Sequence, residues 1–144
     1  MKPSSKAKLG WLGLLLLQPL FSGCGEPAAG GRPGWRLASM EVAGKPTTLP
    51  AGFEVRLDAF DAAAATNRLG GYAGVNSFGC QLVRSNGQHY ARGPVVATRR
   101  GASAEFMRLE AAILKVIEGA ELRPTDRTLV LSREDTVLRF EPKP

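Results

Sequence analysis

From residue 35 onward, apolar and polar residues alternate in short runs, and this period of two most constrains the fold of the chain. The alternation is typical of antiparallel strands that bury one face. The runs 35–40 and 53–60 both show it, and we expect Trp35, Leu37 and Ser39 to share one face of the first strand. A chain with this pattern is not a helical bundle.

A β-hairpin is predicted around Asn86 and Gly87, because both residues tolerate positive φ and separate two alternating runs. The segments 44–52 and 61–67 are predicted to be a loop and a polar-alanine connector, since turn residues and small residues dominate them. Further strands are expected at 81–84, 88–92, 95–98, 120–123, 128–132 and 136–141.

One helix is predicted over residues 104–118, with Ser103 as its N-cap and Glu105 favourable in its first turn. Apolar residues recur at helical spacing and form one face of it. These residues are Phe106, Leu109, Ile113, Val116 and Ile117. We therefore expect a mainly β (α+β) fold, in which a small antiparallel, barrel-like sheet carries one amphipathic helix, and in which closure of the sheet removes exposed edges.

The first 23 residues have the layout of a secretory signal, with three lysines before residue 9 and an apolar run over residues 9–21. That run is shorter than the roughly 20 residues that cross a bilayer. Its end, from Leu20 to Cys24, resembles the lipobox of bacterial lipoproteins, although Phe21 replaces the usual leucine. The resemblance implies cleavage before Cys24 and acylation, including palmitate, of that cysteine.

These features divide the chain into a signal peptide (1–23), a flexible tether (24–34) and one folded domain (35–142). Two or more acyl chains hold a protein stably at a membrane. In lipoproteins of this kind, Gly25 rather than Asp after the cysteine implies passage to the outer membrane, with the domain in the periplasm.

Charge argues against a nucleic-acid partner. Loss of the three signal lysines lowers the formal net charge from +6 to +3, and the remaining basic residues are scattered along the chain. Nucleic-acid binders concentrate basic residues on one stripe or helix.

Catalytic, cofactor and metal sites are not predicted. The chain has one histidine, His89, and two cysteines, Cys24 and Cys80, so neither a nucleophile–base pair nor a metal-ligand cluster is indicated. We expect His89 to lie at the surface or half-buried, and Cys80 to be buried and inert rather than a reactive thiol. The glycines before Val75 lack the lysine and helix of a phosphate loop, so we expect turns and close backbone approaches, with Asn76 bonding its own turn.

The segment 35–140 resembles the META domain of HslJ-like envelope proteins. The resemblance rests on a Trp-x-Leu opening, a Gly-x-x-Gly-x-Asn-x-Phe element, a following threonine and a glutamate in the helix. The matching residues, which we expect to be structural, are Trp35, Gly71, Gly74, Asn76, Phe78, Thr98 and Glu110. Val75 and Ala102 stand at or near places where the family often has cysteines. Our hypothesis is that apolar packing replaces a disulfide there.

The resemblance implies a non-enzymatic, membrane-anchored envelope lipoprotein that contributes to stress tolerance or envelope upkeep through protein contacts. The alternative is a periplasmic carrier that holds a small ligand inside the barrel. A barrel interior filled by aromatic side chains would argue against the carrier. The aromatic residues expected there are Trp35, Phe53, Phe78, Phe106 and Phe140.

Overall fold

The computed structural model describes residues 34–58 and 67–144. In chain order the elements are β1 (Trp35–Val42), β2 (Lys45–Thr47), β3 (Val55–Leu57), β4 (Arg68–Ala73), β5 (Ser77–Ser85), β6 (Gln88–Ala97), α1 (Ala104–Ile117), β7 (Glu121–Pro124), β8 (Leu129–Arg133) and β9 (Thr136–Pro142). The signal peptide, Cys24 and the tether lie outside the described residues, as does most of the predicted 61–67 connector.

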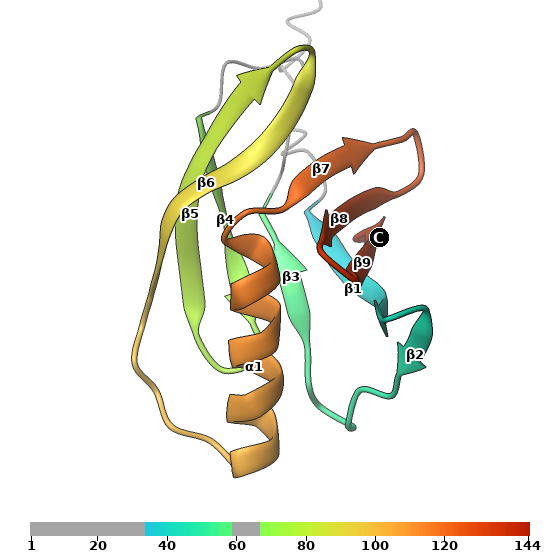
Figure 1. Cartoon of the computed structure of the whole chain (residues 1–144). Helices are drawn as coiled ribbons and strands as arrows, with labels where there is room; N and C mark the ends of the chain where they lie inside the picture. The colour runs from blue at the N-terminus through green and yellow to red at the C-terminus, as the bar shows by residue number, and fades with distance from the viewer. Residues whose placement is uncertain (1–33, 59–66) are drawn as a thin grey trace, which may run out of the picture.

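The strands form one antiparallel sheet that closes on itself. Neighbours run in the order β2-β1-β3-β4-β5-β6-β7-β8-β9, and β1 also pairs with β9, so within the described residues eight strands form a barrel. The short β2 lies outside this ring and pairs antiparallel with residues Met40–Val42 of β1. The predicted fold class, a small barrel-like antiparallel sheet with one helix on it, is confirmed (Figure 1).

Helix α1 packs between two parts of the barrel. It lies between β4–β6 on one side and the β1, β8 and β9 region on the other (Figure 1). Ser103 caps the helix by accepting a hydrogen bond from the backbone N–H of Phe106 at 3.3 Å, as predicted. Ile113 and Ile117 are fully buried against the sheet. The apolar stripe therefore packs against the barrel.

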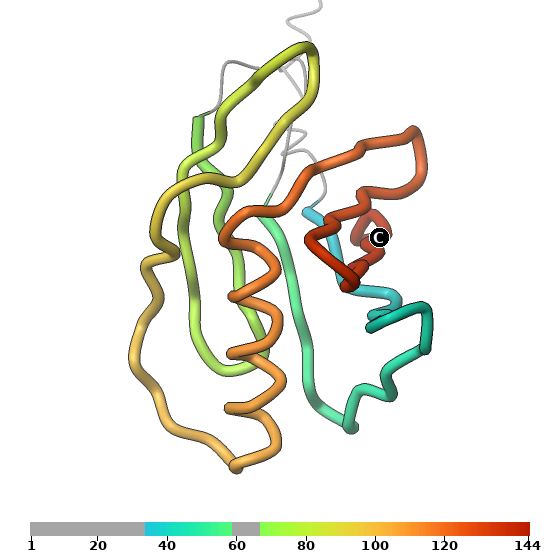
Figure 2. Tube along the Cα trace, in the orientation of Figure 1, coloured from blue at the N-terminus to red at the C-terminus, as the bar shows by residue number. Residues whose placement is uncertain are grey.

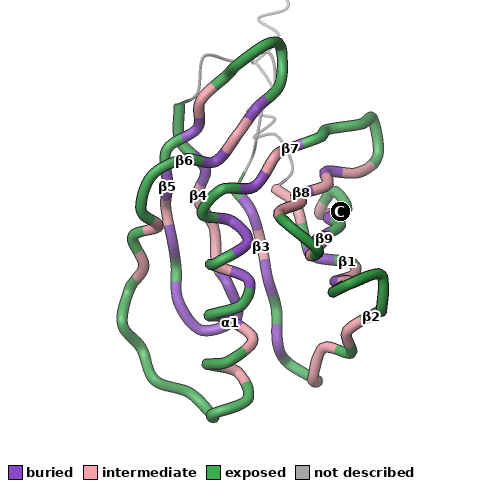
Figure 3. The backbone as a smooth tube through the Cα atoms, viewed as in Figure 1, coloured by how far each residue is buried: buried purple, intermediate pink, exposed green. Residues whose placement is uncertain are grey.

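The interior is filled by side chains from almost every element. Burial is concentrated in the strands and along one face of α1, while the β5–β6 turn and the segment before α1 are exposed (Figure 3). Phe53, Phe78 and Phe140 are buried, and Trp35 and Phe106 pack against the same core. All five expected aromatic residues therefore occupy the core.

The two ends of the domain meet. The backbone N–H of Lys143 donates to the carbonyl of Gly34 at 2.7 Å. The Cα trace enters β1 at the end of the barrel opposite the start of α1 (Figure 2). Within the described residues, no helix has both the length and the apolar character needed to span a membrane.

Two local expectations were wrong. Ser39 does not share a face with Leu37, because the register against β9 shifts between these two residues and Met40 turns inward instead. The expected loop at 44–52 contains strand β2, where Pro46 is tolerated because the strand lies at an edge. In the glycine-rich segment, Gly74 lies in the β4–β5 turn and Gly71 makes a close backbone approach to Arg56, as expected.

Candidate functional site

A buried hydrogen-bond network is centred on Asn76, in the turn between β4 and β5. Its backbone N–H donates to Oε1 of Glu110 at 2.5 Å, and its Nδ2 donates to Oε2 of Glu110 at 2.9 Å. Its Oδ1 accepts from Oγ1 of Thr98 at 2.9 Å and from the backbone N–H of Arg100 at 2.6 Å. Asn76 and Glu110 are only 3% and 4% exposed.

This network joins three distant parts of the chain. Asn76 lies between two strands, Thr98 follows β6, and Glu110 lies in the middle of α1. Contrary to our expectation, the Asn76 side chain does not bond its own turn. It bonds the helix and the segment that leads into it, so that the buried carboxylate of Glu110 is satisfied by hydrogen bonds.

The two motif glycines allow close packing next to this network. Gly74 has φ of +101°, and a Cβ there would overlap the ring of Phe53. That ring in turn packs edge-on against Phe106 of α1, with centroids 5.1 Å apart. A Cβ on Gly71 would overlap the backbone carbonyl of Arg56 on β3. Both positions therefore require glycine.

The seven motif residues do not converge on one cleft. Asn76, Thr98 and Glu110 are brought together, and Gly71 and Phe78 face each other across β4 and β5. Trp35 lies apart from them, half-buried and paired with Leu57 and Pro142. The structural role expected of these seven residues stays a prediction.

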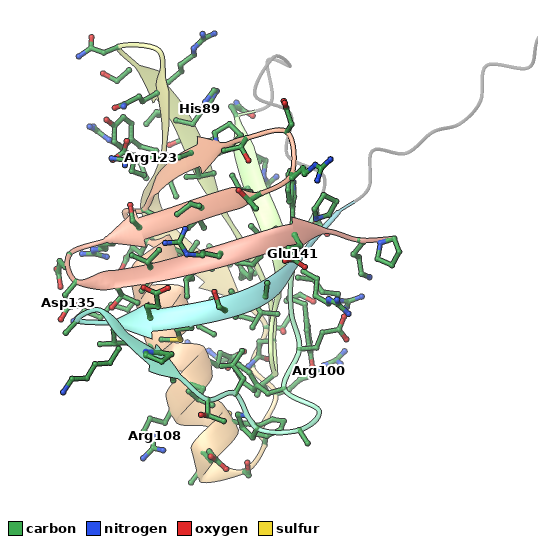
Figure 4. All side chains as sticks on the ribbon, turned by 90° about the vertical axis from the view of Figure 1, so that its right-hand side faces the viewer. His89, Arg100, Arg108, Arg123, Asp135 and Glu141 are labelled. Atoms are coloured by element: carbon green, nitrogen blue, oxygen red, sulfur yellow. The ribbon has the colours of Figure 1, made fainter. Side chains whose placement is uncertain are left out.

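Cys80 and His89 both point into the protein. Cys80 is 5% exposed and free, and burial raises the pKa of its thiol to about 11. Its predicted burial is confirmed. His89 was expected at the surface or half-buried, but it is only 8% exposed, because its position on β6 pairs with Leu122 on the inner face of the barrel. His89 and Arg123 lie at the end of the molecule opposite Arg100 and Arg108 (Figure 4).

Val75 and Ala102, which stand where the family often has cysteines, differ in burial. Val75 is buried, whereas Ala102 is exposed in the segment before α1. An exposed alanine contributes little apolar packing, so this pair gives no support to the hypothesis that packing replaces a disulfide. Across residues 34–58 and 67–144, no three His, Cys, Asp or Glu side chains lie together as a potential metal site.

A cleft of about 680 Å³ lies over β4, β5 and β6. We call it the outer cleft, and its lining includes Arg68, Ser77, Gly79, Gln81, Pro94 and Val96. Of the described residues that line it, Arg68 alone is charged. A smaller hollow of about 320 Å³ shares Arg68 and Gly79 with it and adds Asp58 and Gly70.

The outer cleft was not predicted from the sequence. Its lining comes from three strands, and it depends on a β6 irregularity that periodicity does not reveal. The sequence signals for it are Gly79, a residue without a side chain in the middle of a strand pattern, and the Gly93-Pro94 pair that interrupts the neighbouring strand.

Comparison with known proteins places the domain. The model of the META domain family matches residues 32–144. Solved structures that share the fold include two with named source organisms. One is an NMR structure of a protein from Burkholderia xenovorans, with 16% identity, a TM-score of 0.60, and coverage of 78% of this chain and 82% of that one. The other is a crystal structure of a DUF4847 family protein from Bacteroides vulgatus, with 11% identity, a TM-score of 0.51, and coverage of 77% and 92%. No curated protein matches the chain.

Proposed function

Because the chain belongs to the META domain family, we propose that it is a membrane-anchored lipoprotein of the cell envelope that acts through non-covalent contacts. The observation that carries this proposal is the run from Leu20 to Cys24 at the end of an apolar segment preceded by lysines. Acylation of Cys24 would tie the barrel to a membrane through a tether that ends at Gly34.

The geometry of the domain supports anchoring through its N-terminus. Gly34 sits beside Lys143 at one end of the barrel, and α1 begins at the other end (Figure 1). A tether attached at Gly34 leaves the opposite end free. In and just before α1, Arg99, Arg100 and Arg108 are exposed and available to a protein partner.

The proposal assigns no catalytic step to this domain. The single histidine is buried on β6, and the raised pKa of Cys80 disfavours the thiolate that a cysteine nucleophile needs. The buried carboxylate of Glu110 is occupied by Asn76. His89, Cys80 and Glu110 are therefore poorly placed for nucleophilic or acid–base chemistry.

The interior carrier has no observation in its favour. Phe53, Phe78 and Phe140 are buried in the barrel, and α1 closes over them. A carrier needs an enclosed apolar cavity of several hundred Å³. The outer cleft is open and lies outside the barrel.

Metabolic labelling with a palmitate analogue tests the anchor. We expect label on the wild-type protein and none on Cys24→Ser. Cys80→Ser is the matched control, because Cys80 is the other cysteine of the chain and its thiol is buried. Label that persists in Cys24→Ser, or an unlabelled wild-type protein, would refute lipidation at this residue.

Membrane fractionation tests the compartment separately. The proposal places the wild-type protein in the outer-membrane fraction of a Gram-negative host. Gly25→Asp should retain the labelled protein in the inner membrane without changing the fold, since residue 25 precedes the domain. An identical distribution of both proteins would contradict sorting by this position.

A further inference from the structure

The outer cleft exists because β6 bulges away from β5. Gly79 pairs with Val96 and Gln81 pairs with Arg92, so three residues of β6 lie opposite Cys80 alone. Gly93 adopts φ of +81° within this bulge, a conformation that favours glycine. Pro94, next to it, has no N–H to donate to a regular ladder. The sheet is thus locally opened on its outer face.

The guanidinium of Arg68 lies over the floor of the cleft. Its Nη2 is 3.7 Å from the position that a Cβ on Gly79 would occupy. Arg68 belongs to none of the four ion pairs between described residues, which join Arg56–Glu54, Arg123–Glu121, Arg133–Glu134 and Arg139–Glu41. Within the described structure, this guanidinium is available to an anion from outside the chain.

The surroundings of Arg68 are electropositive. The segment 67–104, which forms β4, β5, β6 and the approach to α1, contains five arginines and no Asp or Glu. Among the described acidic residues, Asp58 lines the smaller hollow, where its Oδ2 lies against Gly70, and it does not line the outer cleft. A ligand anion is therefore favoured at the Gly79 side and disfavoured at the Gly70 side.

The other wall of the cleft is apolar. Val96 is 71% exposed, which is unusual for a large aliphatic side chain in a strand, and Pro94 stands beside it. Ser77 and Gln81 contribute polar side chains to the lining. A volume of about 680 Å³ is within the range of small-molecule sites.

We propose that the outer cleft binds a small organic anion, with its carboxylate or phosphate on the guanidinium of Arg68 and its apolar body against Val96 and Pro94. Arginine presents paired N–H donors that match both kinds of anion. A nucleic acid does not suit this site, because phosphate-backbone binding draws on several cationic contacts and the cleft offers one. The proposal goes beyond the envelope function and does not depend on the anchor.

Calorimetric titration of the purified full chain tests the site. The probes are 2-naphthoate for the carboxylate and 1-naphthyl phosphate for the phosphate, with 2-naphthamide as the uncharged control. We expect saturable binding of at least one anion and much weaker binding of the amide. The relative affinities of the two anions identify which group the site prefers.

Variants of the cleft decide whether binding occurs there. Arg68→Gln should weaken anion binding by about tenfold or more, because it removes a charge-assisted hydrogen bond. Arg68→Lys should be intermediate, since it keeps the charge and loses the paired donors. Gly79→Val should abolish binding by filling the floor, and it should still fold, because its Cβ meets no atom closer than 3.7 Å.

Arg92→Gln is the matched control, because Arg92 of β6 pairs with Gln81 of β5 but does not line the cleft. Its affinity should stay within about twofold of wild type, since screened charges outside a site act weakly. Urea unfolding checks that each variant is folded. Equal affinity for 2-naphthamide, unchanged binding in Arg68→Gln, or no binding of either anion would overturn the proposal.

Discussion

Glu110 accepts two hydrogen bonds from Asn76, one from the backbone N–H at 2.5 Å and one from Nδ2 at 2.9 Å, although the residues are 34 positions apart. Both are almost fully buried. A buried carboxylate is costly unless hydrogen bonds satisfy it, so this pair fixes the position of α1 on the barrel at one point. The apolar face of the helix contributes buried apolar area, whereas the hydrogen bonds between Asn76 and Glu110 fix where the helix sits along the barrel.

Glu110→Gln should destabilise the fold by about 2–3 kcal/mol, because it replaces one carboxylate acceptor by an amide donor that faces Asn76. Urea unfolding followed by circular dichroism measures the change. Glu118→Gln, an exposed change at the end of the same helix, should stay within about 0.5 kcal/mol of wild type. Equal effects of the two substitutions would show that the network does not stabilise the fold.

Gly74→Ala should be more damaging than Gly87→Ala. Both glycines have positive φ, but a Cβ at Gly74 overlaps the ring of Phe53, whereas a Cβ at Gly87 meets nothing within 4 Å. We expect about 1 kcal/mol of backbone strain at Gly87 and at least about 3 kcal/mol at Gly74, where overpacking adds to strain. Thermal unfolding of the two variants compares them directly. Similar losses would mean that the Phe53 ring moves aside freely.

Local patterns predicted most of the barrel. The strand at Trp35, the hairpin at Asn86, the helix after Ser103 and the final strands all arise from neighbours in sequence, through alternation, turn chemistry or capping. The failures have a different origin. The inward turn of Met40 depends on a bulge against β9, and the pairing of β2 depends on β1, so neither is encoded within the segment itself.

The candidate sites were predicted unequally. Asn76, Thr98 and Glu110 were selected through resemblance to a family, and no local pattern indicated that they meet. The burial of Glu110 contradicts the ordinary expectation for a helix glutamate, and only the partner atoms of Asn76 explain it. Arg68 was not selected, because a cleft between three strands becomes visible only when their register is known.

Thr98→Val should cost about 1–2 kcal/mol, because Oγ1 of Thr98 donates to Asn76 and accepts from the backbone N–H of Ser77. Combined with Glu110→Gln, its cost should be less than the sum of the two single changes by about 0.5 kcal/mol or more, since both act through Asn76. A double-mutant cycle in urea measures this coupling. Strict additivity would indicate that Asn76 holds its position without either partner.

The thiol of Cys80 should react slowly in the folded protein. Alkylation requires the thiolate, and burial raises the pKa of this group from 9.0 to about 11. In a Cys24→Ser background at pH 8, iodoacetamide should modify the folded chain about 90-fold more slowly than the urea-unfolded chain, from the thiolate fraction alone. Mass spectrometry of timed samples gives both rates. Rapid modification of the folded chain would contradict the burial of Cys80.

The same raised pKa predicts a loss of stability in alkali. The folded state holds the thiol proton more tightly than the unfolded state does, so this contribution is fully present below about pH 9 and is lost as the pH rises toward about 11. Cys80→Ala removes the titrating group and isolates its effect from those of tyrosine and lysine. The difference in unfolding free energy between wild type and Cys80→Ala should be constant from pH 7 to 8 and should shift against wild type above pH 9. A difference that does not change with pH would mean that the thiol titrates alike in both states, and that Cys80 reaches solvent in the folded barrel.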